Sequence, residues 1–506
     1  MPAVAVTDFE DLPHRRLGEV ALARAAELGV EHADFRFERI RYQHLGARDG
    51  VLQASSEHTG TGFAVRVVSR GAWGFAAGVV LTDDEARRVG TTAVEVAALA
   101  APMTREPVRL APEPTYDDVR WAARVGLDPF SVPTRDKAAL LVDWTERLRA
   151  HDAVDHATAD VQLVAEDKYY ADLAGTRTTQ HRVRVDPQAE AMGTDPGSGV
   201  FDSMRTLAPP TARGWEYLLG DGHDWDSELA GLGDLLAEKL RAPSVEAGPL
   251  DLVIHPSNLW LTIHESIGHA TELDRALGYE ANYAGTSFAT PDLVGSLRYG
   301  SPVMHVTGDR TEPHGLATTG WDDEGVATTR WDLVRDGILV GYQLDRSMAA
   351  AMPHLAVDGG RSNGCAYADS PGHVPLQRMA NVSLQPAAGG PSTAELIGRV
   401  ERGLYVVGDR SWSIDMQRFN FQFTGQQFHR IVDGELAGQV RDVAYQATTT
   451  DFWGAMEAVG GPQTWELGGA FNCGKAQPGQ VAAVSHGCPT ALFRGIRVLN
   501  TSEEGA

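Results

Sequence analysis

The sequence predicts an α+β protein: an N-terminal α/β domain, residues 1–243, followed by a mostly-β domain, residues 244–506, with one conspicuous helix at its start. Three observations predict this arrangement. Helix and strand patterns alternate through the first half of the chain. Residues 241–249, which contain two prolines and a glycine, have the composition of a linker. Beyond them, Asp-Gly turns between strand-forming runs replace the helix patterns.

The first half is expected to contain four helices and several strands. Thr82 or Asp83 is a good helix cap, and apolar residues recur at helical spacing after it. β-branched and aromatic residues mark the strands, and residues 62–68 and 72–76 are expected to form a hairpin. The expected helices are residues 15–28, 83–100, 134–150 and 226–240, and the expected strands lie near residues 35–42, 62–68, 72–76, 161–165 and 182–185.

The second half is expected to be rich in hairpins. The pairs Asp336-Gly337 and Asp433-Gly434 each lie between two strand-forming runs, which is typical of a two-residue hairpin turn. Four aromatic residues, Trp412, Phe419, Phe421 and Phe423, are expected to pack in the core of this half.

Composition excludes several classes of protein. With 43% hydrophobic and 22% charged residues, the chain resembles a globular protein rather than a disordered one. Its net charge of −24 disfavours nucleic acid and anionic lipid surfaces as partners. Three cysteines are too few for a disulfide framework. The N-terminal residues lack a signal-peptide pattern and no apolar run is long enough to span a membrane, so a cytoplasmic location is expected.

The helix after Pro256 carries the candidate metal site, His264-Glu265-Ser-Ile-Gly-His269. The two histidines are five residues apart, which on a regular α-helix separates them by roughly 140°. They can share one ion only if the helix widens, as in a π-bulge, or ends between them, and Gly268 is a plausible weak point. Two histidines and a glutamate on an otherwise apolar segment would be costly to bury without a partner. The pattern therefore predicts a metal site with local helix distortion.

Short segments along nearly the whole chain support a more specific interpretation. They are Gly60-Thr-Gly-Phe-Ala-Val-Arg66, His264-Glu265-Ser-Ile-Gly-His269-Ala-Thr-Glu272-Leu-Asp274, Gly285-Thr286-Ser287, Asp322-Asp323-Glu324-Gly325, Arg361-Ser-Asn-Gly364, Arg378-Met-Ala-Asn381, and Cys473-Gly474-Lys475 with Gln480. In this order they resemble the TldD branch of the TldD/PmbA (TldE) family of metallopeptidases.

The resemblance implies zinc (Zn2+) held by His264, His269 and Cys473, with Glu265 as the general base that activates a zinc-bound water. Glu272 is a rival third ligand, although a supporting role is favoured for it. Cys365 and Cys488 are the other thiols, and packing is the better interpretation of both. Glu272, Asp274, Asp323 and Glu324 are candidates for supporting the ligands or contacting the substrate.

By the same resemblance, the chain is expected to be a zinc metallopeptidase of the HExxxH type that hydrolyses unfolded or small peptides. A heterodimer with a TldE-like subunit or a homodimer is expected, with the N-terminal domain mediating dimerisation and enclosure. Three alternatives remain: a specialised hydrolase that trims a peptidyl or amino-acyl precursor in a biosynthetic pathway, a regulatory protein-binding subunit of the gyrase-modulator type, and a metal-free TldE-like partner. The intact metal motif argues against the last.

Overall fold

A computed structural model describes residues 8–502. It confirms the predicted α+β class, with a mostly-β C-terminal region. Most of the segment on which the absence of a signal peptide was predicted, residues 1–7, lies outside the described part. Within residues 8–502, the helices are too short or too polar to cross a membrane. The division at residues 243 and 244 stays a prediction.

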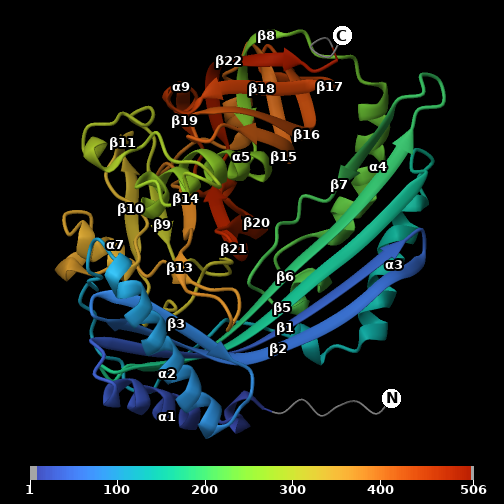
Figure 1. Ribbon diagram of the computed structural model, residues 1–506. Coiled ribbons are helices and arrows are strands. Elements are labelled where there is room, and N and C mark those ends of the chain that lie inside the picture. The colour runs from blue at the N-terminus through green and yellow to red at the C-terminus, as the bar shows by residue number, and fades with distance from the viewer. Residues whose placement is uncertain (1–7, 503–506) are drawn as a thin grey trace.

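A twisted seven-stranded sheet dominates the N-terminal half (Figure 1). Its strand order is β3-β2-β1-β5-β6-β4, and β7 pairs with β6. The four long strands are antiparallel neighbours. The strands are β1 (His32–Arg48), β2 (Val51–Ser69), β3 (Ala72–Gly78), β4 (Val119–Ala122), β5 (His156–Asp172), β6 (Arg177–Thr194) and β7 (Phe201–Arg205). The expected strands are present but longer, and β4 and β7 were missed.

One face of this sheet is apolar and helix-covered. On β1, Phe35 and Phe37 point to that face, because side chains alternate along a strand. The helices α1 (His14–Glu27) and α2 (Asp83–Ala100) pack near one end of the long strands, and α3 (Thr134–Arg149) and α4 (Trp225–Arg241) near the other (Figure 1). All four helices match the expected ranges to within a residue or so, and Thr82 caps α2 as predicted.

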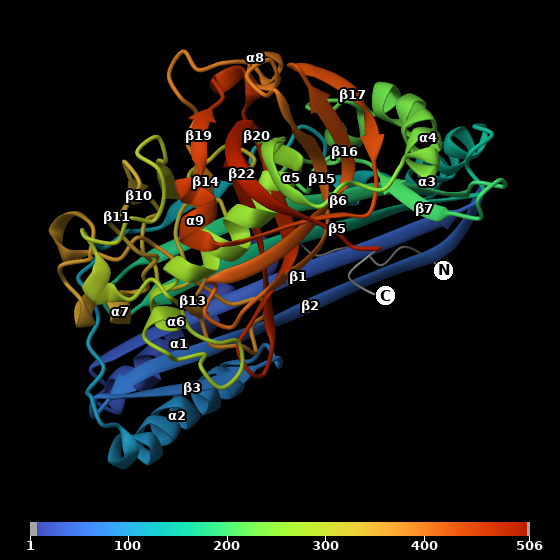
Figure 2. The same ribbon diagram turned by 90° about the horizontal axis from the view of Figure 1, so that it is seen from above.

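The other face of the sheet is charged and buried against the C-terminal half, which lies across it (Figure 2). Between Phe35 and Phe37, Arg36 points to this face and is only 2% exposed. Ion pairs join the two halves: Arg66 Nη1 lies 2.8 Å from Glu324 Oε1, and Lys168 Nζ lies 2.8 Å from Asp323 Oδ2. Because a buried charge is costly unless paired, these contacts fix how the two halves sit together.

The C-terminal half is built on a second seven-stranded sheet that closes on itself, because β15 pairs with both β8 and β16. Its strands are β8 (Gly248–Ile254), β15 (Arg402–Ile414), β16 (Asn420–Val432), β17 (Glu435–Val440), β18 (Val443–Thr448), β19 (Met456–Val459) and β22 (Ala491–Asn500). Smaller sheets contain β9 (Val306–Asp309), β10 (Arg330–Arg335), β11 (Ile338–Leu339) and β14 (Asn381–Leu384), the pair β12 (Ala366–Tyr367) and β13 (Leu376–Gln377), and the pair β20 (Glu466–Lys475) and β21 (Gln480–Cys488).

Few helices interrupt these strands. They are α5 (Pro256–Ile263), α6 (Leu273–Ala276), α7 (Arg346–Ala351), α8 (Thr393–Ile397) and α9 (Thr449–Gly454). Both predicted Asp-Gly turns are confirmed, since Asp336-Gly337 joins β10 to β11 and Asp433-Gly434 joins β16 to β17. All four turn residues have positive φ, the conformation that a type I′ hairpin turn requires.

Candidate metal centre

The site begins where β8 runs into α5. Pro256 occupies the first turn of the helix, where its missing N–H costs nothing, and the His255 side chain accepts a hydrogen bond from the Ser257 N–H. Leu259, Leu261 and Ile263 belong to the large C-terminal core, so the helix is held by apolar contacts. This packing directs the residues that follow toward β20 and β21.

Directly after α5, residues His264–Gly268 form one π-helical turn. The His269 N–H bonds the His264 carbonyl, five residues back, instead of a carbonyl four residues back. The extra residue returns the two histidines to the same side, with ring centroids 4.7 Å apart. The predicted helix distortion is confirmed. A Cβ on Gly268 would lie 2.4 Å from Met379 Sδ, so a larger residue here would require that side chain to move.

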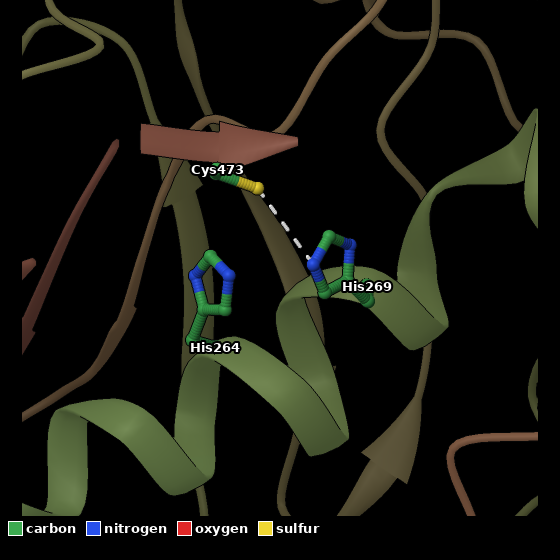
Figure 3. Close-up of side chains that lie close together, drawn as sticks. All are labelled: His264, His269 and Cys473. Carbon is green, nitrogen blue, oxygen red and sulfur yellow. Dashed lines mark hydrogen bonds between the residues drawn. The ribbon is translucent and has the colours of Figure 1, made fainter. Parts of the chain in front are cut away.

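Three potential ligand atoms converge above this turn (Figure 3). One nitrogen of His264, one of His269 and Cys473 Sγ lie within 4.8 Å of one another, and all three residues are buried. Cys473 comes from β20, where the pairing with β21 shifts register between Ala470 and Cys473. Such a bulge redirects a side chain from the regular alternation of the strand. Cys473 Sγ lies 3.7 Å from His269 Nε2.

Each histidine is oriented through its other ring nitrogen. His269 Nδ1 lies 2.8 Å from Glu272 Oε2, an acceptor, so Nδ1 carries the proton and Nε2 keeps its lone pair. His264 Nδ1 lies 2.7 Å from His486 Nε2, and His486 Nδ1 lies 2.9 Å from the Val382 carbonyl. Since a carbonyl only accepts, His486 donates through Nδ1 and accepts from His264 through Nε2. Both Nε2 lone pairs are therefore available to an ion.

Electrostatics favours the forms of these side chains that bind metal. Burial lowers the pKa of His264 and lowers that of His486 far below its ordinary value, which keeps both rings neutral. Burial raises the pKa of the Cys473 thiol, but positive charge beside it, a proton on His269 or a metal ion in its place, favours the thiolate and lowers the pKa. Two imidazoles and a thiolate, with outer hydrogen bonds that set both tautomers, fit a catalytic zinc site.

Glu265 lies beside the three converging residues. Its Oε2 is 2.6 Å from Arg418 Nη1, on the hairpin between β15 and β16. Although burial raises the pKa of Glu265, neighbouring positive charge lowers it below its ordinary value overall: that of His269 and His264 when their rings are protonated, and that of the Arg418 guanidinium, which persists when the rings are neutral. Trp412 also donates to this carboxylate. The prediction that Trp412 is a core residue was wrong: it is 52% exposed and lies on β15, whereas Phe421 and Phe423 are buried on β16.

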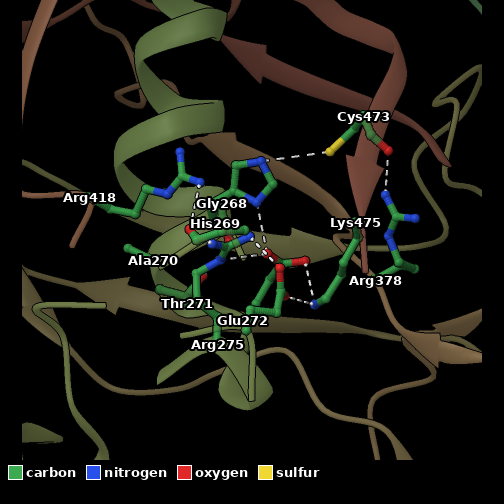
Figure 4. Close-up of polar contacts among 12 residues, drawn as sticks. Gly268, His269, Ala270, Thr271, Glu272, Arg275, Arg378, Arg418, Cys473 and Lys475 are labelled. Atoms are coloured by element: carbon green, nitrogen blue, oxygen red, sulfur yellow. Dashed lines mark hydrogen bonds and ion pairs between the residues drawn. The ribbon is translucent and has the colours of Figure 1, made fainter. Parts of the chain in front are cut away.

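Glu272 points away from the ligand atoms into a buried ion-pair network (Figure 4). Its Oε2 accepts from His269 and from Arg275 Nε at 3.3 Å, and its Oε1 lies 3.1 Å from Lys475 Nζ. Asp274 binds the same Lys475 ammonium at 2.8 Å. Both Glu272 oxygens are thus occupied, which favours the supporting role over the ligand role.

The remaining candidates lie elsewhere. Asp323 and Glu324 are held in the ion pairs between the two halves and make no hydrogen bond or ion pair to the three converging residues within the described chain. Cys365 and Cys488 are fully buried, and burial raises the pKa of Cys365 to about 12. Neither behaves as a reactive thiol.

Sequence reasoning missed three contributors. Lys475 stands in the Cys-Gly-Lys segment, so that motif was a usable signal for it. Arg418 and His486 stand in no recognised pattern. His486 is 222 residues from His264, and only the fold of β21 against α5 brings the two rings together.

Comparison with known proteins identifies the family. The model of the PmbA/TldA metallopeptidase C-terminal domain matches residues 247–500, half of the chain, and the model of PmbA/TldA metallopeptidase domain 1 matches residues 33–97. The chain belongs to the PmbA/TldD family. The resemblance drawn from the motifs is thereby confirmed.

Relatives of this PmbA/TldD chain match along most of its length. A protein of Methanothermobacter thermautotrophicus named metalloprotease is 27% identical, over 93% of this chain and 96% of its own. A zinc metalloprotease TldD homolog of Saccharolobus solfataricus is 22% identical, over 94% of this chain and 98% of its own. The crystal structure of TldE from Thermococcus kodakarensis superimposes with a TM-score of 0.72 at 17% identity, covering 95% of this chain and 99% of that one, so it shows a shared fold.

Proposed function

We propose that this PmbA/TldD chain is a zinc-dependent peptidase of the HExxxH type that hydrolyses unfolded or small peptides in the cytoplasm. One observation carries the proposal: His264, His269 and Cys473 present their ligand atoms to one point, with the Glu265 carboxylate beside it. The names of its relatives, metalloprotease and zinc metalloprotease, agree with this chemistry.

The metal would be held by His264 Nε2, His269 Nε2 and Cys473 Sγ. When bound, zinc supplies a Lewis acid that polarises a scissile carbonyl and activates water. Glu265 is the general base that takes a proton from the attacking water and later gives it to the leaving amine. Its depressed pKa keeps it charged at neutral pH, and Arg418 holds the carboxylate in place.

The surroundings suggest how substrates are limited. His264, Glu265 and His269 are each no more than 6% exposed, so a folded protein does not reach them. An extended peptide, bound through its main chain, fits such a confined site. We further propose that residues 1–243 form a domain for dimerisation and enclosure. The shared fold with TldE supports a TldE-like subunit or a second copy of this chain as the partner.

Metal analysis combined with peptide hydrolysis tests the proposal. Glu265→Gln should keep stoichiometric zinc and lose about 100- to 10,000-fold in kcat, the range typical of a general base. Glu435→Gln, an exposed residue of the β16–β17 hairpin, is the control and should match the wild type. A Glu265→Gln protein of unchanged activity excludes Glu265 as the base, whatever its zinc content.

A second pair of variants identifies the third ligand. Cys473→Ala should lose zinc binding, whereas Glu272→Gln should retain zinc with lower affinity, because it only orients His269. The reverse result would make Glu272 the ligand. Zinc bound equally by both variants would rule out a third ligand at either residue.

A further inference from the structure

A cavity with a basic lining lies where the N-terminal sheet meets the C-terminal half. It measures about 240 Å³ and is bounded by the end of β4, by β6 and by the loop that follows β9. Arg124, Arg182 and Arg184 line it, with Trp121, Thr311 and His314, and none of the described residues around it is acidic. In a chain of net charge −24, this cavity offers a positively charged surface to an anionic ligand.

The cavity floor has more positive than negative charge. Arg182 and Arg184, two residues apart on β6, both bind the single carboxylate of Glu166. That carboxylate also accepts the Tyr367 hydroxyl at 2.6 Å, so both of its oxygens are occupied. Arg182 and Arg184 are 7% and 5% exposed, and Arg184 Nε has no hydrogen-bond partner. The single negative charge of buried Glu166 is therefore paired with the positive charges of two buried guanidinium groups.

Two more arginines lie behind this pair. A small adjoining cavity, about 10 Å³, is lined by Arg182, Arg184, Arg310 and Arg378. Arg310 is 2% exposed, and its Nη1 has no hydrogen-bond partner. Arg378 is 1% exposed, and its Nε has no hydrogen-bond partner. Asp322 is the other carboxyl near Arg310, and three backbone N–H groups already bind it. Buried donors without a hydrogen-bond partner are destabilising, and more so when they are charged.

We propose that Arg182 and Arg184 form the floor of an oxyanion-binding site, with Arg124 at its mouth. A guanidinium presents parallel N–H groups that match the two oxygens of a carboxylate or phosphate. Such a ligand supplies negative charge beside Arg182 and Arg184 and accepts a hydrogen bond from Arg184 Nε, which has no partner within the described chain. The bound oxyanion is either free phosphate or the terminal carboxylate of a peptide. The three candidate metal ligands do not line the cavity, so the inference is independent of the proposed peptidase function.

Calorimetric titration of the full-length, zinc-loaded protein carrying Glu265→Gln, which should not hydrolyse peptide probes, tests the site at constant ionic strength. The probes are inorganic phosphate and two trialanine peptides, one with a free and one with an amidated carboxyl end. Saturable phosphate binding with no preference between the peptides supports a free-anion site. At least tenfold tighter binding of the free-acid peptide supports a site for peptide carboxylates. If neither probe saturates, the proposal is wrong.

Three variants locate the binding. Arg124 is exposed and makes no hydrogen bond or ion pair within the described chain, so Arg124→Gln should fold normally and bind the probe about tenfold more weakly. Arg184→Gln should lose binding. Arg105→Gln, an equally exposed arginine outside the cavity, is the control for net charge and should match the wild type. If Arg184→Gln fails to fold, Arg124→Gln still tests the proposal. An affinity for the probe equal to that of the wild type would show that Arg124 is not part of the site.

Discussion

His264 Nδ1 lies 2.7 Å from Nε2 of His486, although the two residues are 222 positions apart in the chain. The Val382 carbonyl accepts a hydrogen bond from Nδ1–H of His486, so His486 Nε2 must accept the hydrogen bond from His264 Nδ1. His264 is left with a free lone pair on Nε2, the atom that faces the other candidate ligands. A histidine on β21 thus sets the tautomer of a histidine on the π-helical turn.

Removing this orienting bond should weaken metal binding. His486→Phe keeps a ring in the space beside Trp260 but removes the acceptor for His264. Loss of such an outer partner typically costs 10- to 100-fold in metal affinity, and we expect zinc affinity to fall by that factor. Competition with a chromophoric chelator measures it. His429→Phe, at a half-buried histidine of β16, is the control. Unchanged zinc affinity in His486→Phe would mean that the bond does not orient His264.

Arg418 should control the pH dependence of the reaction. Its guanidinium is one of the groups that lower the pKa of Glu265, together with His269 and His264. Arg418→Gln removes that positive charge, so the pKa of Glu265 should rise. Because a general base acts only when deprotonated, the acidic limb of kcat/KM should move to higher pH. Arg418→Lys, which keeps the charge, should show a smaller move. Identical pH profiles for wild type and Arg418→Gln would contradict the role assigned to Arg418.

The π-helical turn should tolerate no side chain at residue 268. An alanine Cβ there would lie 2.4 Å from Sδ and 2.9 Å from Cε of Met379, so the end of this side chain, which is 1% exposed, would have to shift within the core. We expect Gly268→Ala to lower the free energy of unfolding by about 1–3 kcal/mol, the usual cost of overpacking.

Gly231→Ala is the matched control for Gly268→Ala. Gly231 lies in α4 with open space where a Cβ would stand. Alanine in a helix is favoured over glycine, so this variant should gain about 0.5–1 kcal/mol. Urea unfolding of the two variants should therefore give shifts of opposite sign. A stabilised Gly268→Ala protein would show that Met379 does not restrict the turn.

Local patterns predicted the elements well because their causes are local. The five-residue spacing of His264 and His269 predicted a π-bulge or a helix end between them, since helix geometry decides which residues share a face, and the structure has the π-helical turn. The pair Asp433-Gly434 predicted a hairpin because the two-residue turn requires positive φ at both residues, a conformation that only certain residue types accept.

Contacts between residues that are far apart in the sequence could not be predicted from one sequence. Glu265 meets Arg418, and His264 meets His486, only because β15, β16 and β21 close around α5. The acidic run at residues 322–324 had an ambiguous pattern, compatible with a site or with an exposed loop. It is neither exposed nor in contact with the metal centre, because Arg66 and Lys168 of the N-terminal sheet bind it.

The junction between the two halves should be acid-sensitive through Asp34. This carboxyl lies 2.8 Å from Arg66 Nη2, and Arg66 in turn binds Glu324 of the C-terminal half. Burial favours the neutral acid, but the Arg66 guanidinium, together with His32, lowers the pKa of Asp34 to about 2. A carboxyl with a depressed folded-state pKa stabilises the protein above its unfolded-state pKa, and this stability is lost as the pH falls.

The stabilising effect of ionised Asp34 is about 2–3 kcal/mol at neutral pH, and roughly 1 kcal/mol of it should be gone at pH 3. Asp34→Asn should lower the free energy of unfolding by about 3–5 kcal/mol at pH 7, since Arg66 loses a buried partner. The gap between variant and wild type should then narrow as the pH falls from 5 to 3. Urea midpoints across that range measure the gap, with the exposed Asp152→Asn as control. A gap that stays constant with pH would show that Asp34 has the same pKa in the folded and in the unfolded chain. Arg66 would then not lower the pKa of Asp34.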